Sequence, residues 1–170
     1  MYTLNSGRVI FQRWVRIFKS RRIRGIRKKY YGSNLTAAPA AADTIRQNLE
    51  DFGRAPKDYD KIITGDLGLV GQKLLFDLLS EMQIDITKQH MDCGIEIFDS
   101  DKQHTDAGGS GCGCSAVVLS AYILKKLQEG VWKRVLFVPT GALLSKTSFN
   151  EGQTIPGIAH GVVLEHYEQL

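Results

Sequence analysis

The feature that most constrains the fold is a regular alternation of helical and strand-like segments. A helix is indicated over residues 36–53 by its alanines, by the apolar spacing of Ile45 and Leu49, and by Gly53 as a stop. Strands are then expected at residues 61–64, 93–100, 132–142 and 158–167. Helices are expected between the first three of them, at residues 67–83 and 116–127. This order predicts an α/β fold with a mostly parallel sheet and helices on both faces. Because no helix separates the last two strands, they are expected to pair antiparallel.

The third helical segment is expected to be the most buried of the helices. Residues 116–127 carry apolar side chains around much of the helix circumference, including Val117, Val118 and Ala121. Lys125 and Lys126 are expected at its solvent-facing end.

The charge distribution divides the chain into an arm and a body. Residues 1–31 carry ten Lys or Arg and no acidic residue, which leaves 12 basic and 18 acidic residues for the rest, a net charge of −6. Residues 1–33 are therefore interpreted as a basic arm and residues 34–170 as the folded domain. Three interpretations of the arm remain: it contacts an anionic membrane or nucleic acid, it is a solvated tail, or it is sequence that does not belong to the domain's usual structure. Its alternation of apolar and basic residues fits either an edge strand or an interfacial helix.

The glycine-rich stretch 106–118, DAGGSGCGCSAVV, is the most unusual local sequence. Cys112 and Cys114 are too close for an ordinary structural zinc pair, although Cys93 and His104 could complete a set of four. Neither the spacer of a redox pair nor the lysine of a phosphate-binding loop is present. Three readings remain open: close packing at a helix start, packing that also lines a carboxylate-binding pocket, and a catalytic thiol with a histidine base. The candidate bases are His90, His104, His160 and His166.

Small residues also follow two of the strands. TGD occupies residues 64–66 and PTGA residues 139–142. Ligands of open α/β sheets collect at the carboxyl ends of the strands, so these are the expected site positions. The three cysteines lie within 22 residues of one another and do not resemble a disulfide framework, which favours a reducing compartment.

Several motifs in order resemble the stage V sporulation protein AD family of spore-forming Firmicutes, which has a thiolase-like fold. The motifs are APAAADTI, GRAPKDYDKIITGDLG, HTDAGGSGCGCSA, KRVLFVPTGALLS and QTIPGIAH, spanning about residues 34–167. The resemblance implies that this chain is the C-terminal of two similar α/β halves. It also implies no catalysis, since Gly109 stands where condensing enzymes of this superfamily place a histidine, and TGDLG (residues 64–68) stands where they place a second.

The function implied by the resemblance is binding of dipicolinic acid, with calcium as a possible companion and no other cofactor. The protein would belong to the SpoVA apparatus at the inner membrane of the forespore or spore. The expected ligand-binding residues are Thr64, Gly65, His104, Gly108, Gly109, Ser110, Gly111, Cys112, Gly113, Thr140 and Gly141, with no catalytic residue and no metal ligand. Ser115 is a further candidate hydroxyl. Asp66 would repel a dianion unless it were protonated or bridged by a cation, so its place in the site stays open.

The implied partners are other SpoVA proteins, the missing N-terminal half, a second copy in a homodimer, and anionic lipid contacting residues 8–29. Two alternative functions remain. One is an acyl-thioester condensing enzyme that uses Cys112 or Cys114 with His104. The other is a structural docking subunit that binds no small molecule.

Overall fold

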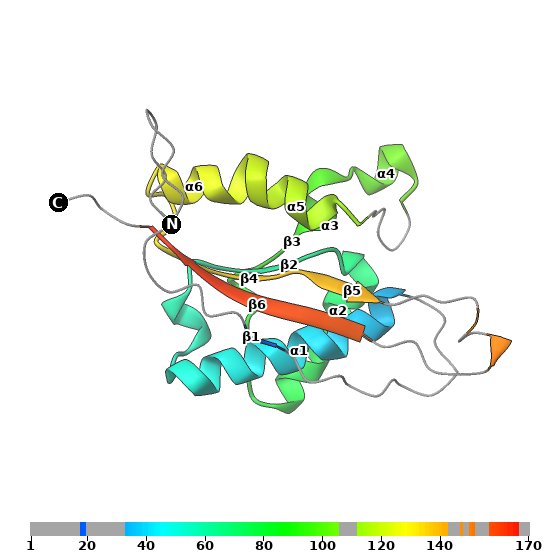
Figure 1. Cartoon of the computed structure of the whole chain (residues 1–170), viewed down its shortest axis with the longest axis horizontal. Coiled ribbons are helices and arrows are strands. Elements are labelled where there is room, and N and C mark those ends of the chain that lie inside the picture. Colours follow the sequence, from blue (N-terminus) through cyan, green and yellow to red (C-terminus); the bar gives the residue numbers. More distant parts are fainter. Residues whose placement is uncertain are drawn as a thin grey trace.

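The computed structural model is built on a central sheet with helices on both faces (Figure 1). It describes residues 18–19, 33–105, 112–142, 147, 150–151 and 157–166. The sheet has six strands: β1 (Phe18–Lys19), β2 (Lys61–Thr64), β3 (His90–Asp92), β4 (Arg134–Val138), β5 (Thr140–Ala142) and β6 (Gly157–Glu165).

The strand order is β1-β6-β4-β2-β3, with β5 paired to β6 beside this path. Strand β2 runs parallel to both of its neighbours, β3 and β4, whereas β6 runs antiparallel to β4, β5 and β1. The predicted α/β class, with helices on both faces and an antiparallel pair at the C-terminal end, is therefore confirmed. Because β2, β3 and β4 share one direction, their carboxyl ends meet at one edge of the sheet.

One face of the sheet is covered by α1 (Ser33–Phe52) and α2 (Gly68–Glu81). A short 3₁₀ turn, η1 (Pro56–Asp58), joins α1 to β2. Helix α1 is the most deeply packed helix described: five of its alanines and Ile45 are at most 4% exposed. Such small side chains bring the helix axis close to the strands, and Thr44 on α1 donates a hydrogen bond to the Ala159 carbonyl of β6.

The other face carries a second set of helical segments, which lie above the sheet in Figure 1. Its longest helix contains a π turn, η2 (Leu119–Ile123), between α5 (Cys114–Val118) and α6 (Leu124–Gln128). Val118, Ile123 and Leu127 pack from this helix onto the sheet. The remaining segments on this face are α3 (Cys93–Ile97) and α4 (Ser100–Gln103).

Two expectations from the sequence are wrong. Residues 93–100, expected as a strand, form α3 and the start of α4, and the strand lies just before them at β3. The cause is Asp92, whose side chain accepts hydrogen bonds from the backbone N–H groups of Gly94 and Ile95 and so caps a helix there.

The helix over residues 116–127 is also not the most buried one. Val117 is 56% exposed, Tyr122 is 39% exposed, and Ala121 is exposed as well, because this helix packs on the sheet with one side only. Val118 is buried and Lys125 is exposed, as expected, whereas Lys126 is half-buried.

The basic arm contributes one short strand. Phe18 and Lys19 pair with Gly161 and His160 of β6, so β1 lies at the edge of the sheet. Residues 1–17 and 20–32 lie outside the described residues, and so does most of the proposed lipid contact. In the described part of the chain, no helix is both long and apolar enough to cross a membrane.

Candidate functional site

The carboxyl ends of β2 and β4 come into direct contact at one edge of the sheet. A Cβ atom on Gly65, the residue after β2, would lie 2.6 Å from the backbone nitrogen of Thr140 and 3.2 Å from Cα of Pro139. The backbone N–H of Asp66 donates a long hydrogen bond, 3.4 Å, to Oγ1 of Thr140. The structure thus brings together Gly65 and Thr140, two of the residues expected in the site.

Asp92, the last residue of β3, organises this edge by accepting hydrogen bonds from five donors. Because both oxygens of the carboxylate accept from donors on two different segments, Asp92 fixes the loop after β2 and the start of α3 to one another. The donors to Oδ2 are the Thr64 hydroxyl at 2.6 Å and the Leu67 N–H at 2.8 Å, and those to Oδ1 are the N–H groups of Gly68, Gly94 and Ile95 at 3.2, 3.2 and 3.3 Å.

His90 continues the network away from the site. Its Nε2 lies 3.0 Å from Oγ1 of Thr64, and its Nδ1 lies 3.0 Å from Nε2 of Gln72. Since the Thr64 hydroxyl donates to Asp92, it accepts from Nε2–H of the imidazole, and the Gln72 amide donates to Nδ1. Burial lowers the pKa of His90 to about 4, so the ring is neutral at pH 7. The Thr64 hydroxyl, expected as a ligand contact, is therefore already bonded within the protein.

Asp66 is the one carboxyl group at this edge whose oxygens are buried without a hydrogen-bond donor among the described residues. Its Oδ1 lies so close to Gly94 that a Cβ atom on Gly94 would overlap it. Burial and, second, the charge of Asp92 raise the pKa of Asp66 to about 6. Sequence reasoning noted the charge of Asp66 but could not see this burial.

The pH dependence of folding should report on this carboxyl group. Because its folded-state pKa of about 6 lies above the value of 3.8 for an unperturbed carboxyl, the folded state holds the proton more tightly. Its stabilising contribution is complete below about pH 3.8 and is lost as the pH rises through about 6. We expect Asp66→Asn to stabilise the chain by about 1 kcal/mol at pH 7, after discounting for partial exposure, and to have little effect near pH 4. Urea unfolding at both pH values measures this. Equal effects at the two pH values would contradict it.

The two buried cysteine thiols, Cys93 and Cys114, lack the lowered pKa of an activated nucleophile. Cys93 and Cys114 are buried, whereas Cys112 is exposed. Burial is the main cause that raises the pKa of both buried thiols, to about 11 for Cys114. A thiol prepared for nucleophilic attack has a lowered pKa, so Cys114 has the opposite character. Within the described residues, no group of three His, Cys, Asp or Glu side chains is arranged to hold a metal ion.

The other expected site residues are only partly placed. Gly108, Gly109, Ser110 and Gly111 lie outside the described residues. Gly113 and Gly141 are exposed, with open space where a side chain would project, and Ser115 is half-buried. His104 is exposed and ends α4 in a left-handed conformation, with φ of 52°.

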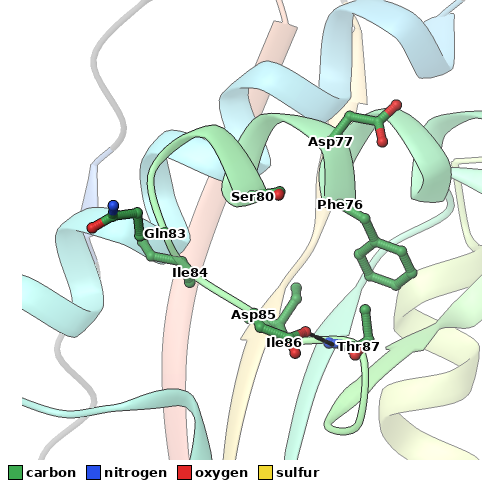
Figure 2. A pocket seen from close by; sticks show the side chains of 8 residues that line it. All are labelled: Phe76, Asp77, Ser80, Gln83, Ile84, Asp85, Ile86 and Thr87. Atoms are coloured by element: carbon green, nitrogen blue, oxygen red, sulfur yellow. Dashed lines mark hydrogen bonds between the residues drawn. The ribbon is translucent and has the colours of Figure 1, made fainter.

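A separate pocket of about 500 Å³ lies between the end of α2 and the segment before β3 (Figure 2). This is the amino end of β3, whereas Asp92 marks its carboxyl end. In Figure 2 the Asp77 side chain points away from the turn in which Asp85 accepts the Thr87 backbone N–H. None of the expected site residues lines this pocket; those that do are Phe76, Asp77, Ser80, Gln83, Ile84, Asp85, Ile86 and Thr87.

Comparison with known proteins identifies the family. The family model described as "Stage V sporulation protein AD (SpoVAD)" matches residues 28–165. This chain belongs to the SpoVAD family. Over 128 residues it is 52% identical to the stage V sporulation protein AD of Bacillus subtilis (strain 168). That alignment covers 75% of this chain but 38% of the relative, so the chain spans well under half of the relative's length.

The SpoVAD assignment confirms the family that the sequence motifs indicated and makes this a sporulation protein. The matched range includes β2, β3, β4 and β6 and therefore the whole edge around Gly65, Asp92 and Thr140. Sequence reasoning did not find the roles of His90 and Asp92. The signal available in the sequence was a threonine at the end of one strand, Thr64, together with an acidic residue, Asp92, beside the next.

Proposed function

We propose that this SpoVAD-family chain forms one wall of a pocket that binds dipicolinic acid without catalysing a reaction. The observation that carries the proposal is the strand-end edge, where Gly65 packs on Thr140 and where Gly113 and Gly141 leave their backbone unshielded. Unshielded backbone lets a small planar carboxylate approach peptide N–H groups closely. Calcium is proposed as a companion of the ligand and not as a cofactor held by this chain.

The absence of catalysis is proposed from the state of the candidate groups. Cys114 is buried with a raised pKa, and both ring nitrogens of His90 are occupied by hydrogen bonds. Acyl transfer needs a nucleophile beside a free base, and these contacts do not supply one. The condensing-enzyme alternative that uses Cys114 therefore has less support than ligand binding, and the other residues of that alternative, Cys112 and His104, are both exposed.

We further propose that the part of the longer relative missing here packs on the exposed side of the α5–α6 helix. Val117 and Tyr122 are 56% and 39% exposed there, and large exposed apolar side chains on one face are typical of an interface. We also propose that the protein attaches peripherally to the inner spore membrane beside other SpoVA proteins. Residues 8–29 would then contact anionic lipid. A homodimer remains a second arrangement for the same exposed face.

The test is calorimetric titration with dipicolinic acid of this chain fused to the N-terminal part of the Bacillus subtilis relative. We expect measurable binding and expect Gly109→Val to weaken it by at least about tenfold, or roughly 1.4 kcal/mol, because a branched side chain enters the glycine-rich stretch. The 170-residue chain alone should bind far more weakly, in the range that NMR titration detects, since it supplies one wall only.

Ser80→Val is the matched control, since Ser80 is exposed and lies in the pocket of Figure 2. It should leave the affinity unchanged. If Ser80→Val weakens binding and Gly109→Val does not, the ligand occupies the other pocket. If neither the fusion protein nor the chain binds, the proposed function is wrong.

A further inference from the structure

Asp66 occupies a position that is unusual for a carboxyl group. It follows β2 directly, at the edge where Gly65 contacts Thr140, and its backbone N–H is bonded to the Thr140 hydroxyl. Both of its carboxyl oxygens are buried, yet neither has a hydrogen-bond partner in the part of the chain that the structure describes. A buried carboxylate without donors is costly, by about 1–3 kcal/mol or more, so such groups usually keep a proton or meet a ligand.

Among the titratable groups around Asp66, the charge of Asp92 disfavours its ionisation, and none of the others supplies a positive charge. Asp92 of β3 accepts five hydrogen bonds and has no donor to offer. The thiols of Cys93 on α3 and Cys114 on α5 lie in the same electrostatic neighbourhood, and the pKa of each is raised. His90 stands behind Thr64 and faces Asp92, and its pKa is lowered, so it is neutral at pH 7. Thr140, the first residue of β5, also lies beside this segment, and its side chain has no charge.

We propose that Asp66, in its protonated form, donates a hydrogen bond to a carboxylate of the bound ligand, so that ligand binding takes up one proton. The proposal rests on the proposed function, because it assigns a role in the same site. It also explains how an acidic residue can belong to a site for a dianion.

The proton balance is simple. Above the pKa of about 6, free Asp66 is ionised, and the arriving dicarboxylate brings a second negative group to the same place. One proton from solvent then joins Asp66, and the resulting O–H donates to a carboxylate oxygen of the ligand. Hydrogen bonds of this O–H···O⁻ kind are short and strong. No bond of the ligand breaks, and no further reactant is needed.

The experiment is NMR titration of the 170-residue chain with pyridine-2,6-dicarboxylate from about pH 5.5 to about pH 8, repeated on the fusion protein. We expect the dissociation constant to rise about tenfold for each pH unit above about 6. In Asp66→Asn the amide is a neutral donor at every pH. This variant should bind with little pH dependence and, near pH 8, roughly tenfold or more tightly than the unaltered chain.

Asp77→Asn is the matched control, because it removes the same charge from an exposed position in the pocket of Figure 2. It should retain the pH dependence of the unaltered chain. The carboxyl ¹³C shift of Asp66 is a second readout and should titrate at a higher pH when the ligand is bound.

The possible failures are distinguishable. Binding that does not change with pH, or an unaltered pH dependence in Asp66→Asn, would overturn the proton uptake and leave the proposed function intact. A carboxyl ¹³C shift showing that Asp66 is ionised in the complex near pH 6 would also overturn the proton uptake. No binding at any pH, in the chain or in the fusion protein, would overturn the proposed function and this proposal together.

Discussion

Asp92→Asn should be among the most destabilising single changes in this chain, with an expected loss of about 3 kcal/mol or more in the free energy of unfolding. Asparagine has the same shape as aspartate, but its amide nitrogen is a donor. That nitrogen would face two or more of the five donors that now converge on the carboxylate. Urea unfolding followed by circular dichroism measures the loss at pH 7.

Asp99→Asn provides the matched control. Asp99 also caps a helix, α4, by accepting the Lys102 N–H, but it is exposed and serves only that short element. Its replacement should cost about 1 kcal/mol or less, because asparagine is itself a good capping residue. If the two variants were equally stable, the network around Asp92 would not contribute the stability expected of it.

The order of elements could be predicted because each segment has a strong local pattern. Lys61–Thr64 is a strand in both the sequence interpretation and the structure, and the alanines of α1 indicated its helix. The segment after β3 could not be predicted in this way. The alternation of Ile95, Glu96 and Ile97 is typical of a strand, but the Asp92 side chain caps the backbone there and starts a helix. A single side chain, that of Asp92, decided the outcome.

The exposed side of the α5–α6 helix shows a second limit of pattern reasoning. Apolar residues such as Val117 predict burial, but they do not say against what. In this chain the sheet covers the side that carries Val118 and Ile123, and Val117 remains 56% exposed. Hydrophobic patterning identifies apolar side chains without identifying the surface that covers them, and the aligned part of this chain spans 38% of the relative's length.

The sequence suggested which segments form the candidate site but not the contacts within it. Strand ends followed by TGD and PTGA were interpreted as site positions, and the structure places Gly65 of the first against Thr140 of the second. The link between Thr64 and His90 joins residues 26 positions apart, and it depends on the register of β2 against β3. Register and burial are tertiary properties, so the buried state of Asp66 and the role of Asp92 required the structure.

The contact between Gly65 and Thr140 yields the second large expected effect. Gly65→Ala would place a methyl group 2.6 Å from the Thr140 nitrogen, which is well inside van der Waals contact. Because that neighbour is backbone, relief requires the end of β2 to move away from Pro139 and the start of β5. We expect a loss of about 2–3 kcal/mol, at the upper end of the cost of overpacking, measured as a lower urea midpoint.

Gly141→Ala is the control for this change, since Gly141 is exposed in β5 and a Cβ atom there meets nothing within 4 Å. Alanine at that position should change stability by less than about 0.5 kcal/mol. Neither glycine has a positive φ, so backbone strain does not distinguish the two substitutions. A difference in stability between the two variants therefore reports the close contact at Gly65. A Gly65→Ala variant as stable as Gly141→Ala would show that the strand ends are not in the close contact on which the candidate site is built.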